Sequence, residues 1–300
     1  MTISDDIRGE FKSLDKPKQT TVYIVTIDKI LNEFLEDDFN FEICLRYLSL
    51  DEQLKVRSKK YDSKKELINR LFTRLVLNLQ VDNSDSFQPF NALKFQYNEY
   101  GKPSLLRAID DGKNFQFNAS TSNDILSMVI QSGIESSVGI DLSHSRQKID
   151  PDSCIEDFRQ IFDDSEYQHL SQIENKNDQY NTFNQYWTLK EAFTKLLGCG
   201  LNIDLASFWF DLKSTAQSLV HCKPNNVSKV ENFKYFYKHD VDWTTNINIR
   251  GKAVQDIEKC YCVSGIISPI IISVISQLPL ERNLQVIGVD MYQLLLDYTK

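Results

Sequence analysis

The stretch YWTLKEAFTKLLGCGL, Tyr186–Leu201, predicts a helix that ends at a glycine and carries charges beside its apolar face. At about 100° per residue, the apolar side chains form one broad arc, which contains Phe183, Tyr186, Trp187, Leu189, Phe193, Leu196 and Leu197. Lys190 falls inside this arc, and Glu191 and Lys195 lie together along its edge. Burial of Lys190 would require a partner anion, either a ligand phosphate or a carboxylate.

The Glu191–Lys195 pair also has a simpler interpretation. On a solvated face, an i,i+4 ion pair stabilises a helix by roughly 0.2–0.5 kcal/mol and needs no further explanation. That interpretation does not account for Lys190. The residues therefore favour a helix that packs on one side and takes part in a site at its edge.

A second carboxylate stands in an apolar strand pattern, SVGIDLS, at Asp141. Taken alone, Asp141 is best interpreted as a strand-end residue in solvent. Together with Glu191 it favours a different interpretation, because two carboxylates on rigid elements, with few soft ligands available, suit a hard cation such as Mg²⁺.

Basic residues gather in the run KVRSKKYDSKKELINR, which contains Lys55, Arg57, Lys59, Lys60, Lys64, Lys65 and Arg70 against two acids. Such runs are mostly solvated helix faces, but in a chain of net charge −8 a local cluster can also attract an anionic ligand. The Gly-Lys-Pro turn that follows Tyr100 presents Lys102 from a rigid loop.

The composition favours an ordinary globular protein and argues against several other classes. The 300 residues are 41% hydrophobic and 25% charged, as in ordinary globular proteins, and the acidic total argues against a nucleic-acid binder. Six cysteines without a CxxC pair and only four histidines favour core thiols in a reducing, cytoplasmic compartment over a zinc site. The longest apolar run, residues 262–280, predicts a buried strand followed by a short helix rather than a membrane span.

The order of patterns predicts an α+β protein of two subdomains. Residues 1–20 are expected to form a flexible tail, residues 21–138 an N-terminal α+β subdomain and residues 139–300 a C-terminal one. Helical patterns precede strand patterns in each part, so the two subdomains are expected to be similar and to pack pseudo-symmetrically.

Four motifs, in order along the chain, resemble those of the larger, surfactin-synthetase-activating type of 4'-phosphopantetheinyl transferase. They are YGKP (Tyr100–Pro103), FNAS (Phe117–Ser120), GIDL (Gly139–Leu142) and WTLKEAFTKLLGCGL (Trp187–Leu201). The chain is also similar to the fungal lysine-pathway branch, through FNFEICLRYLSL (Phe39–Leu50), NRLFTRLVL (Asn69–Leu77) and the closing LLLDY (Leu294–Tyr298).

The resemblance implies an enzyme, a holo-[acyl-carrier-protein] synthase, with coenzyme A in the cleft between two similar halves. The 4'-phosphopantetheine arm is transferred to a serine of an apo carrier domain, here that of aminoadipate reductase in lysine biosynthesis. By motif position, Asp141 and Glu191 would hold Mg²⁺, and Lys195 would contact the phosphate as a catalytic residue.

Further roles follow from the same resemblance. Lys65 and Lys102 would bind the nucleotide end of coenzyme A, and Ser120 would lie on the same wall. Lys190 would face ligand or carboxylate charge in the cleft. Glu166 matches a third acidic position of the family, so either Glu191 or Glu166, directly or through water, is expected to act as the base.

Two positions depart from the common pattern. Ser143 stands where many members have Glu, and Thr121 stands where many have His. The resemblance then implies that water completes the metal's shell, with the Ser143 hydroxyl beside it, and that Ser143→Ala and Ser143→Glu are both tolerated.

Three alternatives remain at this point: a broad activator of polyketide and nonribosomal peptide synthetase carriers, a non-catalytic coenzyme A-binding scaffold, and a Mg²⁺-dependent phosphohydrolase. The expected partners are coenzyme A and an apo carrier domain, without nucleic acid or membrane, and the protein is expected to be a monomer.

Overall fold

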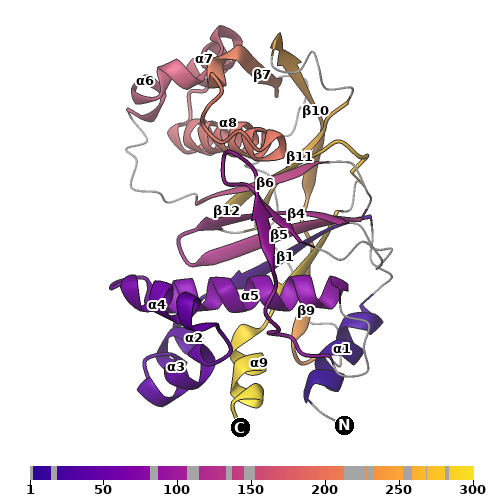
Figure 1. The fold of residues 1–300 in the computed structure, drawn as a ribbon. Coiled ribbons are helices and arrows are strands. Elements are labelled where there is room, and N and C mark those ends of the chain that lie inside the picture. Colours follow the sequence, from indigo (N-terminus) through magenta and orange to yellow (C-terminus); the bar gives the residue numbers. More distant parts are fainter. Residues whose placement is uncertain are drawn as a thin grey trace.

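The computed structural model describes residues 3–14, 19–81, 87–106, 115–132, 137–144, 153–212, 227–228, 233–252, 259–267, 269–280 and 284–300. Helices and two main sheets alternate in layers (Figure 1). One group of helices lies below the first sheet, and α8 with shorter helices lies above the second (Figure 1). The α+β fold class is therefore confirmed.

The first sheet has the strand order β4-β5-β1-β13-β9-β8. Its strands are β1 (Thr20–Thr26), β4 (Phe115–Ser122), β5 (Ile125–Ser132), β8 (Val227–Ser228), β9 (Phe236–His239) and β13 (Gln285–Val289). β1 is buried on both faces because its residues alternate between two cores: Tyr23 and Val25 join the helical core, and Val22 and Ile24 join the core shared with the second sheet.

Helices from both ends of the chain cover the lower face of the first sheet (Figure 1). They are α1 (Ile3–Ser13), α2 (Lys29–Phe34), α3 (Asp38–Leu45), α4 (Leu50–Ser58), α5 (Ser63–Val81) and α9 (Met291–Tyr298). Leu67, Leu71 and Leu75 of α5 are fully buried in this core, at the helical spacing that the sequence shows.

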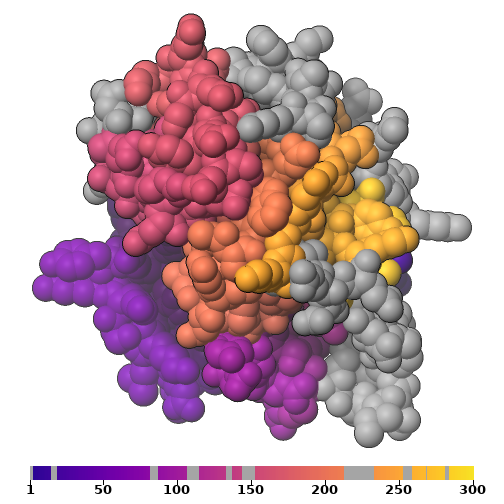
Figure 2. Space-filling model, turned by 90° about the horizontal axis from the view of Figure 1, so that it is seen from above, coloured from indigo at the N-terminus to yellow at the C-terminus, as the bar shows by residue number. Residues whose placement is uncertain are grey.

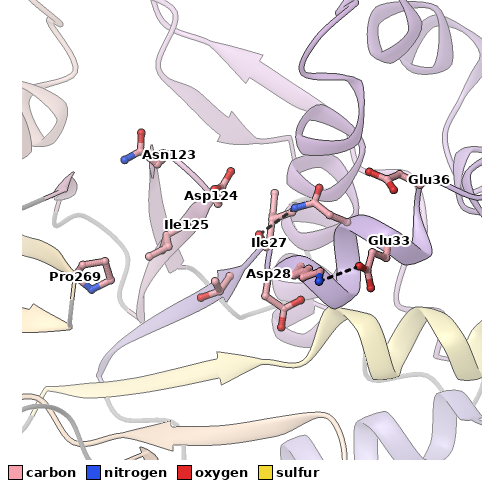
Figure 3. A pocket seen from close by; sticks show the side chains of 11 residues that line it. Ile27, Asp28, Glu33, Glu36, Asn123, Asp124, Ile125 and Pro269 are labelled. Atoms are coloured by element: carbon pink, nitrogen blue, oxygen red, sulfur yellow. Dashed lines mark hydrogen bonds and ion pairs between the residues drawn. The ribbon is translucent and has the colours of Figure 1, made fainter. Parts of the chain in front are cut away.

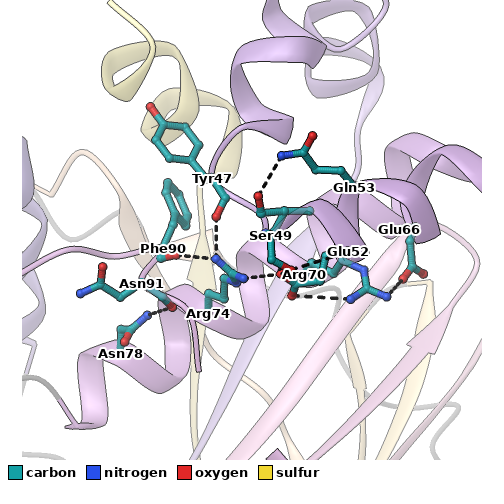
Figure 4. Close-up of polar contacts among 11 residues, drawn as sticks. Tyr47, Ser49, Glu52, Gln53, Glu66, Arg70, Arg74, Asn78, Phe90 and Asn91 are labelled. Atoms are coloured by element: carbon teal, nitrogen blue, oxygen red, sulfur yellow. Dashed lines mark hydrogen bonds and ion pairs between the residues drawn. The ribbon is translucent and has the colours of Figure 1, made fainter. Parts of the chain in front are cut away.

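Arg74, a buried arginine of α5, ties together the loop after α3, helix α4 and the residues after α5 (Figure 4). The Arg74 guanidinium donates to the carbonyl oxygens of Tyr47 at 2.5 Å and Phe90 at 2.8 Å, and it pairs with Glu52 at 2.5 Å. Much of the basic run is likewise used within the fold, because Arg57 pairs with Glu42, Lys64 with Glu36 and Arg70 with Glu66.

The second sheet has the order β6-β12-β11-β10-β7. It contains β6 (Val138–His144), β7 (Phe208–Asp211), β10 (Trp243–Gly251), β11 (Tyr261–Ile267) and β12 (Ile270–Ser276), and a separate hairpin pairs β2 (Phe95–Tyr97) with β3 (Pro103–Leu105). α8 (Lys176–Leu197) lies on the second sheet and packs also against α7 (Asp164–Ser171) and α6 (Cys154–Asp157). The 3₁₀ turns η1 (Arg159–Ile161) and η2 (Leu205–Ser207) adjoin this layer.

α8 ends at the glycine that the sequence predicts, and a side-chain cap marks its first turn. The Asn175 side chain accepts from the backbone N–H groups of Asn177 and Asp178, which caps the first turn. Gly198 follows the last turn at φ 71°, a left-handed conformation that glycine adopts without strain. The apolar arc of α8 lies in a core shared with α6, α7 and β7.

Three expectations about the organisation are corrected by the structure. Residues 3–13 form α1 rather than a flexible tail, because Ile7 is fully buried and the Glu10 carboxylate accepts from the backbone N–H groups of Lys234 and Tyr235. The second part of the 262–280 run is strand β12 rather than a helix, since its β-branched residues pair with β11 and β6.

The third correction concerns the C-terminal subdomain. β13 pairs in parallel with β1, and α9 packs in the helical core of the first sheet, so residues 284–300 belong with the N-terminal layers. The pattern of helices followed by strands cannot show a strand returning to a distant sheet. Within the described ranges, no helix is long and apolar enough to cross a membrane.

Candidate active site

The two sheets meet where edge strand β4 of the first faces edge strand β6 of the second. An edge strand leaves a row of backbone groups without ladder partners. Here the Ile140 N–H donates to the Asn118 side-chain oxygen at 3.2 Å, and the Leu142 N–H donates to the Ser120 hydroxyl at 3.3 Å. Side chains of the FNAS motif therefore join the two sheets at the strand that carries Asp141.

Asp141 is nearly buried at this junction, with 6% of its surface exposed. Its Oδ1 accepts from the Ser120 hydroxyl at 2.8 Å and from the Lys195 ammonium at 2.6 Å. Lys195 also donates to Ser120 at 3.0 Å. Burial raises the pKa of Asp141, and Lys195 and Ser120 oppose that rise by favouring the charged form.

Gly139 explains how α8 comes so close to β6. A Cβ at this position would lie 2.0 Å from the Ala192 carbonyl oxygen and 2.7 Å from the Leu196 nitrogen. Both distances are shorter than any real contact, so only glycine lets the helix backbone rest on the strand. The close approach brings the edge of α8, with Glu191 and Lys195, to Asp141.

Glu191 completes the cluster and lacks a partner for one oxygen. Its Oε1 is buried and makes no hydrogen bond. Burial raises the pKa of Glu191, the charge of Asp141 raises it further, and Lys195 opposes both. An unpartnered carboxylate oxygen beside a second carboxylate is a conflict that a bound cation would relieve.

The donor set therefore fits a hard divalent cation. Carboxylate oxygens are the ligands that Mg²⁺ prefers, with water or phosphate oxygens completing its shell. Among the described residues, no group of three or more His, Cys, Asp and Glu side chains is placed to hold a metal. Two protein carboxylates would thus have to share the ion with water or a ligand.

Lys102 reaches the same helix from the β2–β3 hairpin. Its ammonium donates to the Leu196 carbonyl oxygen at 3.0 Å, and the Asn98 side chain donates to the Gly198 carbonyl oxygen at 2.8 Å. Both contacts satisfy carbonyls at the negative end of the helix, and Figure 2 shows the hairpin and the residues after α8 meeting at the surface. Burial lowers the pKa of Lys102 to about 8.

Lys65 is one of the predicted site residues that the structure does not bring to the cluster. It lies in the first turns of α5, half-buried, and makes no ion pair with any described residue. No contact joins it to the cluster of Asp141, Glu191 and Lys195 within the described part of the chain.

Lys190 and Glu166 form a separate pair. Lys190 Nζ lies 2.8 Å from Glu166 Oε2, with both side chains fully buried, and it also donates to the carbonyl oxygens of Leu205 and Phe208. The other Glu166 oxygen accepts from the Phe210 N–H at 2.9 Å. The Lys190 ammonium therefore has three acceptors, and each oxygen of Glu166 accepts at least one hydrogen bond from the protein.

This geometry bears on two expectations. Of the two anions left open for Lys190, a ligand phosphate or a carboxylate, the structure shows the carboxylate of Glu166. Both oxygens of Glu166 accept from protein donors, and among the described residues no contact joins Glu166 to the Asp141 cluster, so its role as a base stays a prediction. The pair joins α8 to α7 and β7, on the side of the helix away from Asp141.

The two residues that depart from the common family pattern, Ser143 and Thr121, differ in burial. Ser143 is fully buried and donates to the Asn184 side-chain oxygen at 2.5 Å, whereas Thr121 is exposed. Sequence reasoning did not single out Asn118 or Asn184. The signal for Asn118 was present, because it stands two residues before Ser120 and so shares its face of the strand.

An open hollow of about 690 Å³ lies at the end of β1, beside the turn that joins β4 to β5 (Figure 3). Four carboxylates and one lysine line it: Asp28, Glu33, Glu36, Asp124 and Lys29. Its net charge is therefore negative and repels phosphate groups. None of the cluster residues lines it. The Asp141 cluster, with two lysines beside it, is the better candidate for a phosphorylated ligand.

Comparison with known proteins supports the resemblance. Residues 137–246, which include β6 and α8, match the 4'-phosphopantetheinyl transferase superfamily. The L-aminoadipate-semialdehyde dehydrogenase-phosphopantetheinyl transferase of Candida glabrata is 30% identical over 199 residues, which cover 66% of this chain and 72% of the relative.

Two further relatives agree. The protein of the same name from Saccharomyces cerevisiae is 27% identical over 61% of this chain and 64% of its own length. The 4'-phosphopantetheinyl transferase Sfp of Bacillus subtilis is 29% identical over 65% of this chain and 78% of its own length. With the motifs, the α+β fold and these alignments in agreement, the chain belongs to the 4'-phosphopantetheinyl transferase superfamily.

Proposed function

We propose that this chain transfers the 4'-phosphopantetheine arm of coenzyme A to a serine of an apo carrier domain and releases adenosine 3',5'-bisphosphate. One observation carries the proposal: β6 and α8 bring Asp141, Glu191 and Lys195 into one partly buried cluster. Two carboxylates and a lysine are what a pyrophosphate with a divalent cation requires.

The cation is Mg²⁺ in this proposal, held by Asp141 and Glu191. When bound, Mg²⁺ neutralises charge on the pyrophosphate oxygens. Lys195 adds a second positive charge for the phosphates, and Lys102 and Lys65 bind the nucleotide end. Ser120 keeps Asp141 and Lys195 in place through its hydrogen bonds to both.

The carrier serine must lose its proton as its oxygen attacks phosphorus. The sequence leaves Glu191 and Glu166 as candidates for the base. Glu191 is favoured, because its Oε1 has no hydrogen-bond partner, whereas both oxygens of Glu166 accept from protein donors.

The carrier domain of aminoadipate reductase is the proposed acceptor. Support comes from the names of the two fungal relatives and from the motifs shared with that branch. Similarity to the Bacillus protein keeps a broader set of carriers as the second candidate. The proposal places the protein, as a monomer, in the cytoplasm; the five described cysteines form no disulfide, which suits a reducing compartment.

The test is mass spectrometry of apo carriers incubated with the protein, coenzyme A and Mg²⁺. Carriers from an aminoadipate reductase, a peptide synthetase and a polyketide synthase form the panel. A gain of the phosphopantetheine mass on the aminoadipate reductase carrier, at the highest rate of the three, is expected. Binding of coenzyme A without modification of any carrier would indicate a scaffold, and breakdown of coenzyme A without a carrier would indicate a hydrolase.

A further inference from the structure

Helix α8 carries a row of polar residues on the side that faces the second sheet. Asn184, Thr188, Glu191 and Lys195 are spaced by four, three and four residues, which places them within an arc of about 60°. An interface between a helix and a sheet is ordinarily apolar. Here a row of polar residues runs beside the apolar contacts that Leu189 and Phe193 make in the same layer.

The first two residues of the row have partners on the sheet. Asn184 accepts from the Ser143 hydroxyl of β6 at 2.5 Å, and its own amide donates to the Tyr180 carbonyl oxygen at 2.8 Å. The Thr188 hydroxyl shares a hydrogen bond of 2.7 Å with Ser273 of β12, which donates to Ser264 of β11 at 3.0 Å. We call these five residues, Asn184, Ser143, Thr188, Ser273 and Ser264, the polar ladder.

The polar ladder is enclosed by protein. Ser143, Thr188, Ser273 and Ser264 are fully buried, and Asn184 is 1% exposed. In the strand pairing of the second sheet, Ser273 lies directly opposite Asp141, and Ser264 lies directly opposite Ser273. One hydrogen bond of Thr188 therefore reaches Ser273, the residue beside the metal-binding candidate Asp141, and the other returns to the Gln185 carbonyl oxygen of its own helix at 3.0 Å.

Stability alone does not explain these residues. Replacing buried polar pairs by apolar side chains of similar volume often leaves a protein equally stable. Hydrogen bonds differ from apolar contacts in being directional. A shift of α8 by one residue would move it about 1.5 Å and turn it about 100°, which would break both contacts from the helix to the sheet, Asn184 to Ser143 and Thr188 to Ser273.

We propose that the polar ladder fixes the position of α8 on the second sheet and so sets Glu191 and Lys195 against Asp141. Its members are positioning residues, because they act through the cluster without touching a ligand. The chemical part of this inference rests on the proposed function, while the geometric part concerns the cation site alone.

This assignment changes the interpretation of Ser143. The sequence suggested a hydroxyl beside a metal-bound water, with Ser143→Glu tolerated. Since Ser143 is fully buried and donates to Asn184, a glutamate there would place a longer, charged group against α8. Ser143→Glu is therefore expected to fail where Ser143→Ala loses only one contact of the ladder.

Thr188→Val tests the proposal, and Thr194→Val is its matched control. Both residues are fully buried on α8, and valine keeps the shape of threonine. Both hydroxyls bond back to a carbonyl oxygen of their own helix at 3.0 Å, Thr188 to Gln185 and Thr194 to Glu191. Only Thr188 also bonds across to the sheet, at Ser273. Thr188→Ser, which keeps the hydroxyl and loses a methyl group, is the rescue variant.

Two measurements are made on all four proteins: Mn²⁺ binding by titration calorimetry in the presence of coenzyme A, and carrier modification as a function of Mg²⁺. We expect Thr188→Val to weaken Mn²⁺ binding and lower kcat by about tenfold each, the effect of one lost buried hydrogen bond. Thr194→Val and Thr188→Ser should stay within about twofold of the wild type.

The outcomes separate the two proposals. Equal behaviour of Thr188→Val and Thr194→Val in both measurements would overturn the positioning role. A wild-type protein that binds Mn²⁺ but modifies no carrier contradicts the proposed function, and the polar ladder is then judged on Mn²⁺ binding alone. Loss in Thr188→Ser equal to that in Thr188→Val would show that the methyl group matters, which also contradicts the proposal.

Discussion

Glu191 experiences two opposed electrostatic influences. Burial and the neighbouring Asp141 favour its protonated form, and Lys195 favours its charged form. A bound cation would also favour the charged form of Glu191. Functional sites typically contain residues of this kind, whose charged form is unfavourable in the free protein but is needed when the ligand is bound.

Asp141→Asn and Glu191→Gln are each expected to reduce carrier modification by a factor of about 100 or more, because each removes a charge that the cation requires. The measurement is the modification rate at saturating Mg²⁺. Glu33→Gln is the control, since Glu33 lies outside the cluster and pairs with Lys29 on an exposed surface. A rate for either site variant close to that of the control would contradict the metal assignment.

Glu191→Gln is also expected to raise the free energy of unfolding at neutral pH. The folded-state pKa of Glu191 lies above its unfolded value, so the ionised carboxylate opposes folding at any pH above the unfolded pKa. The gain should disappear below about pH 4, where the group is protonated in both states. Urea unfolding at several pH values measures it.

Glu52→Gln is expected to change the free energy of unfolding in the opposite direction. Burial alone would raise the pKa of Glu52, but hydrogen bonds from Ser49 and the charges of Arg74 and Arg70 hold it below its usual value. The ionised form therefore stabilises the fold, and its loss should lower stability at neutral pH. If both variants shift stability in the same direction, charge is not the cause.

At the scale of elements, the β2–β3 hairpin presents Lys102 at the end of α8, and burial holds its pKa at about 8. Lys102→Ala is expected to raise the KM for coenzyme A by about ten- to a hundredfold, the value of one charge-assisted hydrogen bond. The KM of the wild type should rise above pH 8 as the lysine loses its charge, and Lys102→Arg should remove that dependence.

A ligand lacking the 3'-phosphate provides the control for this prediction. With 3'-dephospho-coenzyme A the penalty for Lys102→Ala should be smaller. Lys65→Ala, measured in the same way, tests whether Lys65 contributes to binding although no described contact ties it to the cluster. Equal penalties with both ligands would remove the 3'-phosphate from the proposal.

The contact between α8 and β6 depends on Gly139. Gly139→Ala would place a methyl group 2.0 Å from the Ala192 carbonyl oxygen, so the helix must move off the strand. We expect a loss of about 1–3 kcal/mol in unfolding free energy, as for other overpacked cores, together with loss of Mn²⁺ binding.

Gly9→Ala is the matched control for Gly139→Ala. Nothing lies within 4 Å of a Cβ at Gly9, which stands inside α1. Alanine there should raise stability by about 1 kcal/mol through helix propensity. A Gly139→Ala protein that kept its stability and its Mn²⁺ binding would show that the close approach is dispensable.

Across the whole molecule, the sequence predicts local features better than distant ones. The ends of α8, the apolar arc and the charges along its edge follow from spacing and capping residues, which act over a few positions. The partner of Lys190 could not be predicted, because Glu166 lies 24 residues away and a ligand would satisfy the same requirement. Motif order supplied Asp141 and Glu191, whereas Asn184 gave no signal in an otherwise ordinary helix.

The pairing of Thr21 with Gln285 has a consequence for synthesis on the ribosome. β1 (Thr20–Thr26) is synthesised long before its parallel neighbour β13 (Gln285–Val289). At about 5–20 residues per second, the wait lasts on the order of ten seconds to a minute. During that time β1 is open on the side that β13 will fill, and an unpaired apolar edge attracts other chains. The edge of β1 therefore stays open to other chains until β13 has been synthesised and paired.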